Sequence, residues 1–110
     1  MAYDEDLANR IRELLGPVGG IEEKRMFGGL AFLVNGNMSV AASRDSGLLV
    51  RVAPDDTDKL LERQHVSPMV MGGREMRGWL RVAPDGWKTK RQLQSWVDRG
   101  VGYAGTLPPK

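Results

Sequence analysis

Apolar positions near the N-terminus recur with a helical period. The residues with the i, i+4, i+7, i+8 spacing of one helix face are Leu7, Ile11, Leu14 and Leu15. Three acids, Asp4-Glu5-Asp6, stand at the start of this pattern, where the helix dipole favours negative charge. Gly16-Pro17 follows the last apolar position. The spacing therefore predicts an amphipathic helix that ends at Gly16.

The stretch from Lys24 to Ser43 contains two apolar runs separated by Asn35-Gly36. This dipeptide predicts a β-hairpin, because both central residues of a type I′ turn need positive φ. A two-residue loop then gives the register, which pairs Leu33 with Met38 and Ala31 with Val40 on one face, and Phe32 with Ser39 and Leu30 with Ala41 on the other.

Both faces of this hairpin are partly apolar, whereas a sheet open to water on one side alternates more cleanly. The second face carries Leu30, Phe32 and Val34. So much apolar surface needs a cover, either a helix or a second copy of the chain. Of these two alternatives we predict the homodimer.

Alternation resumes after a turn at Ser46-Gly47 and predicts a strand over 48–52. A short helix follows the acidic start at 54–58, and a weak strand at 69–71 leads into a turn at Gly72-Gly73. Strict alternation then predicts a strand over 76–82. Its inward residues are Met76, Leu80 and Val82, and its outward residues are Arg77, Trp79 and Arg81.

A long helix is predicted after Asp85-Gly86. Its apolar positions at helical spacing are Leu93, Trp96, Val97, Val101 and Ala104, and the pattern ends at 106–109. The predicted order is α-β-β-β-α-β-β-α. We therefore expect an α+β fold of two layers, an antiparallel sheet with helices, in a single domain over residues 1–110.

One pentapeptide occurs twice, as Arg51–Asp55 and Arg81–Asp85, 30 residues apart. Each copy closes a predicted strand and opens a predicted helix. Shared local chemistry explains both copies better than a duplication, because proline suits helix entry and aspartate suits the cap. The repeat places Arg51 and Arg81 equivalently on their two strands.

The composition excludes several classes of chemistry. The chain contains no cysteine, which removes disulfides, cysteine zinc sites and cysteine nucleophiles and suits a reducing compartment. Its N-terminus is acidic rather than basic, and no apolar run approaches the roughly 18 residues of a membrane span. We predict a cytoplasmic protein without membrane contact.

The net charge of +2 is too small to imply a polyanionic partner, but it is unevenly distributed. The acidic segments are residues 1–23, with −4, and 53–73, with −2. The basic segments are 24–52, with +3, and 74–99, with +4. One face of the fold is therefore expected to be mildly basic.

No catalytic, cofactor or metal site is predicted. Residues 100–105 match GxGxxG, yet they lie in the last predicted helix instead of between a strand and a helix, so the dinucleotide motif lacks its context. His65 is the only histidine and has no second imidazole for a metal. Asp55, Asp56 and Asp58 lack the ligand spacing of a calcium loop and are explained by a helix start. We expect no enzyme activity and no cofactor.

One constellation suggests binding: Arg77, Trp79 and Arg81 on one strand face, joined by Arg51 if its strand lies in the same sheet. Arginine beside an indole can hold phosphates while a base stacks, as in single-strand binding. The same residue types are enriched at protein interfaces, and an arginine over an indole also forms intramolecular cation–π pairs. Structural, protein-binding and nucleic-acid-binding interpretations all remain open here.

The sequence resembles the N-terminal domain of the TfoX/Sxy competence-regulator family over nearly its whole length. The segments that carry the resemblance are residues 24–32, Asn35-Gly36-Asn37, residues 49–52, Pro68-Met69 and residues 76–79. The resemblance implies a two-layer α+β fold comparable to secretion chaperones and a regulatory role, without catalytic or ligand residues. Family members carry a second, C-terminal helical domain, so this chain resembles a stand-alone form.

These observations together predict a small non-enzymatic cytosolic domain that acts through protein contacts, with an unidentified protein partner and a regulatory role. Competence and transcription regulation follow from the resemblance only. The alternative is a nucleic-acid-binding domain that uses the face with Arg51, Arg77, Trp79 and Arg81.

Overall fold

The computed structural model describes residues 4–16, 20–26, 29–43, 47–71 and 73–108. The strands among them are β1 (Ile21–Met26), β2 (Gly29–Val34), β3 (Asn37–Ala42), β4 (Leu48–Arg51), β5 (Val66–Met71) and β6 (Arg74–Val82). The helices are α1 (Glu5–Leu15), the 3₁₀ turn η1 (Pro54–Asp56), α2 (Thr57–Leu61), α3 (Pro84–Trp87) and α4 (Lys90–Gly105). The predicted α+β class is confirmed.

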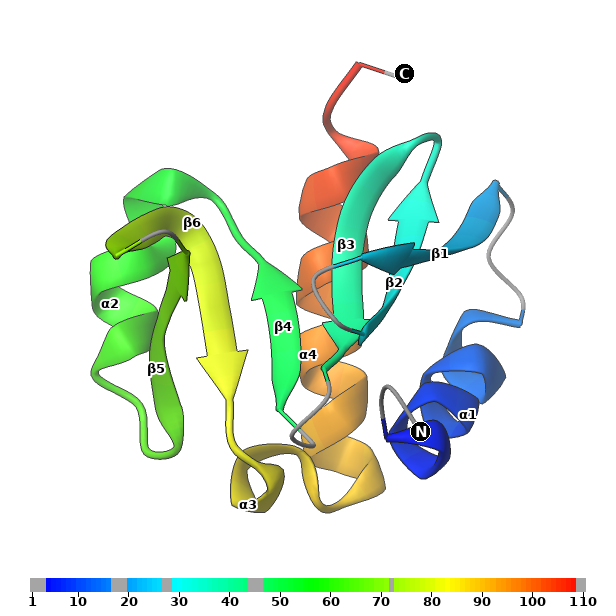
Figure 1. Cartoon of the computed structure of the whole chain (residues 1–110), viewed down its shortest axis with the longest axis horizontal. Coiled ribbons are helices and arrows are strands. Elements are labelled where there is room, and N and C mark those ends of the chain that lie inside the picture. The colour runs from blue at the N-terminus through cyan, green and yellow to red at the C-terminus, as the bar shows by residue number, and fades with distance from the viewer. Residues whose placement is uncertain (1–3, 17–19, 27–28, 44–46, 72, 109–110) are drawn as a thin grey trace.

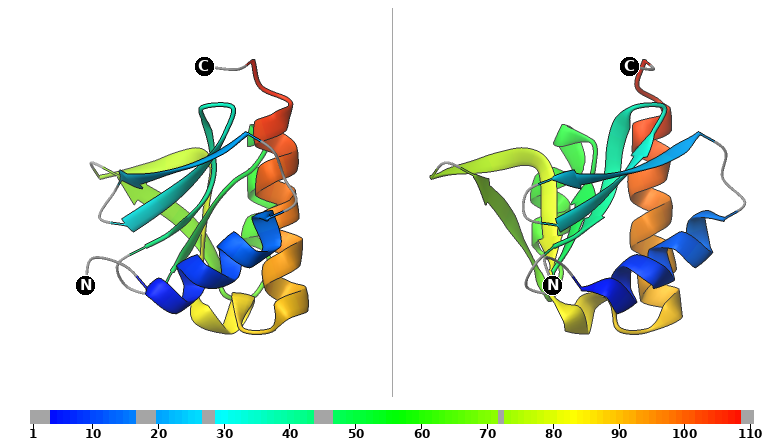
Figure 2. Two further views of the ribbon diagram at one scale, coloured as in Figure 1. Left: turned by 90° about the vertical axis from the view of Figure 1, so that its right-hand side faces the viewer. Right: turned by 45° about the vertical axis from the view of Figure 1, so that its right-hand side comes forward.

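The strands form one antiparallel sheet in the order β1-β2-β3-β4-β6-β5, so that β1 and β5 are its edges (Figure 1). Helices α1 and α4 lie on one side of this sheet (Figure 2). Within the described residues, no helix is both long enough and apolar enough to cross a membrane.

Two elements differ from the predicted order. The expected first strand from Lys24 is two strands, because β1 ends at Met26 and pairs antiparallel with β2. Its sequence, IEEKRM, has charged residues on both faces, a pattern that does not mark a half-buried strand. Residues 84–87 also form the separate short helix α3 before α4. Parts of the predicted turns at 16–17, 46–47 and 72–73 and of the segment 24–32 lie outside the described residues.

The hairpin turn is confirmed: Asn35 and Gly36 have φ of 51° and 85°. Leu33 pairs with Met38 as predicted, but the register shifts by one residue beyond them, so that Phe32 faces Val40. The predicted Phe32–Ser39, Ala31–Val40 and Leu30–Ala41 pairs are therefore wrong. A bulge at Ser39 causes the shift, and the buried Ser39 hydroxyl donates a 2.8 Å hydrogen bond to the Phe32 carbonyl.

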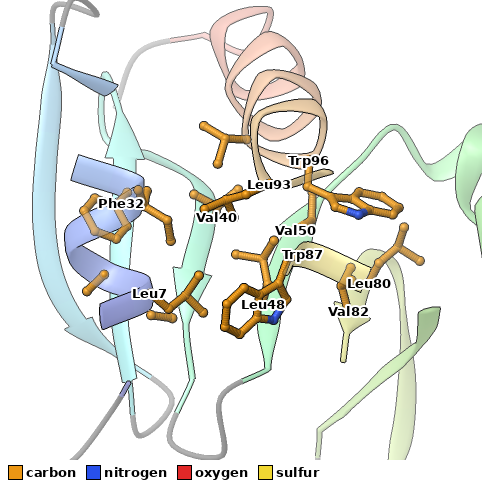
Figure 3. Packing of buried hydrophobic residues seen from close by; sticks show 14 of the residues in the cluster. Leu7, Phe32, Val40, Leu48, Val50, Leu80, Val82, Trp87, Leu93 and Trp96 are labelled. Atoms are coloured by element: carbon orange, nitrogen blue, oxygen red, sulfur yellow. The ribbon is translucent and has the colours of Figure 1, made fainter. Parts of the chain in front are cut away.

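The main core lies between the sheet and the helices. Figure 3 shows side chains of β2, β3, β4 and β6 meeting those of α1, α3 and α4. The labelled members are Leu7, Phe32, Val40, Leu48, Val50, Leu80, Val82, Trp87, Leu93 and Trp96. The largest of these side chains are almost fully removed from water. Such burial is the dominant favourable term in folding.

The hairpin face that the sequence assigned to a homodimer belongs to this core. Leu30 and Phe32 pack in the main cluster with α1 and α4 residues, and Val34 is also buried. Helices therefore cover this face, and the preference for a second copy of the chain there was wrong. A covering helix and a second copy of the chain are both compatible with the same apolar pattern, so the pattern alone did not distinguish them.

The opposite face of the sheet carries a second cluster of buried residues. Its members are Ala31, Leu33, Met38, Ala41, Leu49 and Met69, with Met76 and Trp79 packed against them. Because the strands alternate, residues of this cluster stand next in sequence to residues of the main core. The central strands are consequently apolar on both faces.

Polar interactions join α1 to its surroundings. The Asp4 side chain accepts a hydrogen bond from the Leu7 amide and caps α1. Arg12 donates from Nε and Nη2 to both carboxylate oxygens of Glu23 on β1, at 2.8 and 2.7 Å. These hydrogen bonds hold the pKa of the Glu23 carboxyl below its usual value. The pair connects the first helix to the β1 edge of the sheet.

Candidate interaction surfaces

Arg51 and Trp79 are brought together as the sequence suggested. Arg51 ends β4, and its backbone lies directly opposite Trp79 on β6. The Arg51 guanidinium carbon is 5.3 Å from the centre of the Trp79 ring and 5.8 Å from that of Tyr103 on α4. Both distances are within the range of cation–π attraction. One cation thus connects two strands and the last helix.

The predicted alternation of β6 fails before Leu80. The β5–β6 register shifts between Pro68, which pairs with Leu80, and Val70, which pairs with Glu75. Between these two pairs, β5 has one residue, Met69, and β6 has four, residues 76–79. Gly78 has a φ of 90°, a left-handed conformation that favours glycine, and its amide donates a 2.9 Å hydrogen bond to the buried Thr57 hydroxyl. The irregularity puts Met76 in the second cluster with Trp79, instead of on the core side with Leu80.

The other two arginines of the predicted face point to different neighbours. Arg77 is exposed and lies 3.7 Å from Asp58 of α2 in a surface ion pair. Arg81 pairs with Leu49, and its guanidinium is close enough to Gly47 that an added Cβ there would lie 3.1 Å away. Arg77 thus has an acidic neighbour on α2, while Arg81 lies two residues from Trp79 on β6, opposite Leu49 of the second cluster.

Tyr103 is the member of this cluster that sequence reasoning missed. It lies in α4, one turn after Arg99 and within the glycine-rich segment. Nothing in the local pattern pairs it with Arg51, which is 52 positions earlier. A contact of this kind follows only from the packing of α4 behind β4.

The remaining candidate motifs have structural roles. Residues 100–105 lie inside α4, so the glycine pattern does not open a helix as a dinucleotide motif does. A Cβ on Gly100 would come within 2.6 Å of the Ser39 carbonyl, which makes this glycine a helix–sheet contact. Asp55 and Asp56 lie in η1 and Asp58 in α2, at a helix start as predicted. His65 is exposed, with a φ of 68°, and its carbonyl accepts from the Ala83 amide.

The two edges of the sheet differ in chemistry. β1 has four consecutive charged residues, 22–25, which protect an edge against pairing with other chains. β5 reads VSPMVM and has no charged residue. Its Val70 is 59% exposed, the highest exposure of a large apolar side chain in the described part of the chain. The β5 edge is thus the uncharged one.

Hydrogen bonding in the β5–β6 ladder determines which groups β5 presents outward. The His65 carbonyl accepts from Ala83 at 2.8 Å, so 65 and 83 form a hydrogen-bonded pair. Alternation along an antiparallel ladder then points the backbone groups of Val66 and Pro68 away from β6. Proline lacks an amide hydrogen and is tolerated at such an outward position on an edge strand.

Fold and surfaces together define a small α+β domain with an open antiparallel sheet, helices on one face and one uncharged edge. The family model of the TfoX N-terminal domain matches residues 13–104. The chain belongs to this family, as the resemblance of its motifs predicted. A comparison with curated proteins found no match.

Proposed function

We propose that this domain is a non-enzymatic, cytosolic regulatory module that binds an extended segment of a protein partner at the β5 edge. Membership of the TfoX N-terminal domain family supports a regulatory role. The uncharged, exposed β5 edge supports the mode of binding, because an added strand gains main-chain hydrogen bonds there. This edge is the observation that carries the proposal.

The side chains of β5 indicate what the partner segment presents. Val66 packs against the main core, and Val70 lies on the same side of the strand with more than half of its surface exposed. Pro68 lines a shallow cavity of about 230 Å³ between α2 and the start of β6, whose other lining residues are Leu61, Met76 and the polar Thr57, Asp58, Glu75 and Arg77. An incoming strand with an apolar residue opposite Val70 would cover this surface. Pockets for alternate side chains give such complexes their specificity.

Pro68 favours a partner strand over a second copy of the chain. In an antiparallel pair of two β5 strands centred on Pro68, both central residues would lack an amide hydrogen. A strand from another protein meets only one proline and therefore loses fewer hydrogen bonds. The partner is accordingly a different chain that adopts an extended conformation.

The arrangement of the arginines supports protein binding over nucleic-acid binding. Arg51 packs against Trp79 and Tyr103, and Arg77 is next to Asp58. Single-strand binding needs a continuous basic groove with aromatic rings available for stacking. Here the Trp79 ring packs against Arg51 and the second cluster, which leaves it less available for stacking on a base.

A site-specific cross-link tests the proposal, since the chain contains no cysteine and an introduced one is unique. Val70→Cys, labelled with a short photoactivatable group, should yield one defined protein adduct in native cell extract. Lys24→Cys on the β1 edge is the matched control and should not. Unlabelled wild type should compete for the adduct, while Val70→Lys should not compete, because a charge at an edge opposes pairing.

Hydrogen exchange on the purified complex then examines the edge directly. The amides of Val66 and Val70 should exchange more slowly in the complex than in the free domain, as expected for amides that gain main-chain partners. Equal adducts at positions 24 and 70, or unchanged exchange of these two amides in the complex, would rule out strand addition at β5.

A further inference from the structure

A second, independent feature lies between α2 and α4. Two cavities of about 360 and 430 Å³ open there, and Arg63, just after α2, lines both. Lys59 and Arg99 line the first cavity, and Arg91 lines the second. Arg63 is the residue that the linings of the two cavities share.

Arg99 is the most informative of these residues. Its Nε atom is buried and has no hydrogen-bond partner in the described part of the protein. A buried donor without a partner costs free energy, and each such group in a folded protein calls for an explanation. Asp98, the next residue along α4, accepts a 3.1 Å hydrogen bond from Gln94 and so faces elsewhere.

Arg63 is held in position without using its hydrogen-bond donors. Its guanidinium carbon lies 5.4 Å from the centre of the Trp96 ring. The Trp96 ring is itself held by a 3.2 Å hydrogen bond from Nε1 to the Gly86 carbonyl. Stacking on an aromatic face leaves the N–H groups of a guanidinium available to a ligand.

Two acids also line the first cavity, Asp56 and Glu62. Among the described residues, no ion pair joins either acid to Lys59, Arg63 or Arg99. The cations outnumber the acids by a small margin only. A small excess of positive charge favours binding of one phosphate group over binding of a polyanion such as a nucleic-acid backbone.

We propose that the groove between α2 and α4 binds the phosphate group of a small molecule through Arg99, Arg63 and Lys59. The planar fork of a guanidinium matches phosphate oxygens with two parallel hydrogen bonds, and an ammonium adds a compact charge. A phosphate in the first cavity would meet the guanidinium of Arg99, which lines it, while the Nε atom itself stays buried. The site shares no residue with the β5 edge, so it stands independently of the proposed function.

An NMR titration with inorganic phosphate, exchanged for chloride at constant ionic strength, tests the site. Saturable shifts should map to the amides of α2, the following turn and α4. Arg99→Met should weaken phosphate binding by about tenfold or more, the scale of one lost charge-assisted contact. Arg74→Met, which removes an exposed arginine of β6, is the matched control and should change the affinity less than about twofold.

Thermal unfolding without phosphate separates a binding role from a structural one. Arg99→Met should be at least as stable as the wild type, because it removes a buried donor that has no partner. Lys59→Gln, an exposed change, provides a second variant and should weaken phosphate binding by about threefold. Glycerol phosphate is titrated in parallel: tighter binding than inorganic phosphate identifies a phosphate ester as the ligand, and equal binding identifies free phosphate.

Two results would overturn the proposal. One is an absence of saturable shifts in the wild type. The other is that Arg99→Met and Lys59→Gln both bind phosphate as tightly as the Arg74→Met control does. Binding would then reflect general surface charge.

Discussion

Arg51 places its guanidinium over two aromatic rings, Trp79 on the neighbouring strand and Tyr103 on α4. All three side chains are half-buried, which limits the screening of the attraction by water. The aliphatic part of the arginine also covers apolar surface. The residue therefore acts as a structural link between sheet and helix, in line with one of the three interpretations of its sequence.

Removing this link should lower the free energy of unfolding measurably. Arg51→Ala should lose about 1–2 kcal/mol, the sum expected for cation–π contacts to two partly buried rings. Arg77→Ala is the matched control: its partner Asp58 is a surface acid, so the loss should not exceed about 0.5 kcal/mol. Urea unfolding at neutral pH measures both. Equal losses in the two variants would contradict the structural role of Arg51.

At the scale of elements, the position of α4 on the sheet depends on a close approach at Gly100. A Cβ at this position would be 2.6 Å from the Ser39 carbonyl oxygen and 2.8 Å from a Val40 methyl carbon. The Ser39 bulge and the Gly100 contact therefore occur at the same place, where α4 crosses β3. The Ser39 carbonyl belongs to the backbone and cannot shift as the end of a flexible side chain can. A Cβ at position 100 would therefore displace α4 from the sheet.

Two glycines of α4 allow a matched test of this close contact between α4 and β3. Gly100→Ala should destabilise the domain by about 1–3 kcal/mol, as overpacking usually does. Gly102→Ala adds the same atom two residues later, where nothing lies within 4 Å, and should stabilise by about 0.5–1 kcal/mol through helix propensity. Thermal and urea unfolding should give opposite signs for the two variants. The same sign for both would show that α4 does not pack closely on β3.

In the molecule as a whole, the apolar residues that predicted a dimer are buried within a single chain. Leu30 and Phe32 face the helix layer, Val34 is buried, and Val70 is the described large apolar side chain with the greatest exposure. Within the described residues, this single exposed side chain does not form an extended apolar face on which a second copy of the chain could pack. The outward Pro68 further weakens pairing of β5 with itself.

We therefore expect the isolated domain to have the mass of a monomer by light scattering at high micromolar concentration. Val70→Lys should leave this mass unchanged. A dimer that Val70→Lys converts to a monomer would show that β5 pairs with a second copy, and it would also argue against a different protein as the strand donor. A dimer unaffected by Val70→Lys would indicate another self-interface.

Features that depend on neighbouring residues could be predicted from the amino-acid pattern alone. The acidic start of α1, the positive φ values at Asn35-Gly36 and the Leu33–Met38 pair all follow from local rules of helix ends and tight turns. The long α4 follows from the period of its apolar positions. The family followed from motifs spread along the chain, a signal that needs no geometry.

Three features depend on how the whole chain packs: the face that the helices cover, the places where the strand registers shift, and the aromatic ring that each arginine contacts. Phe32 lies under the helices because α1 and α4 pack on that side, although the hairpin is apolar on both sides. Arg51 and Arg81 stand in identical pentapeptides, yet β4 and β6 run antiparallel and bring them to different neighbours. Bulges and helix packing arise from contacts between residues far apart in the chain, and a local pattern of polarity contains no information on those distances.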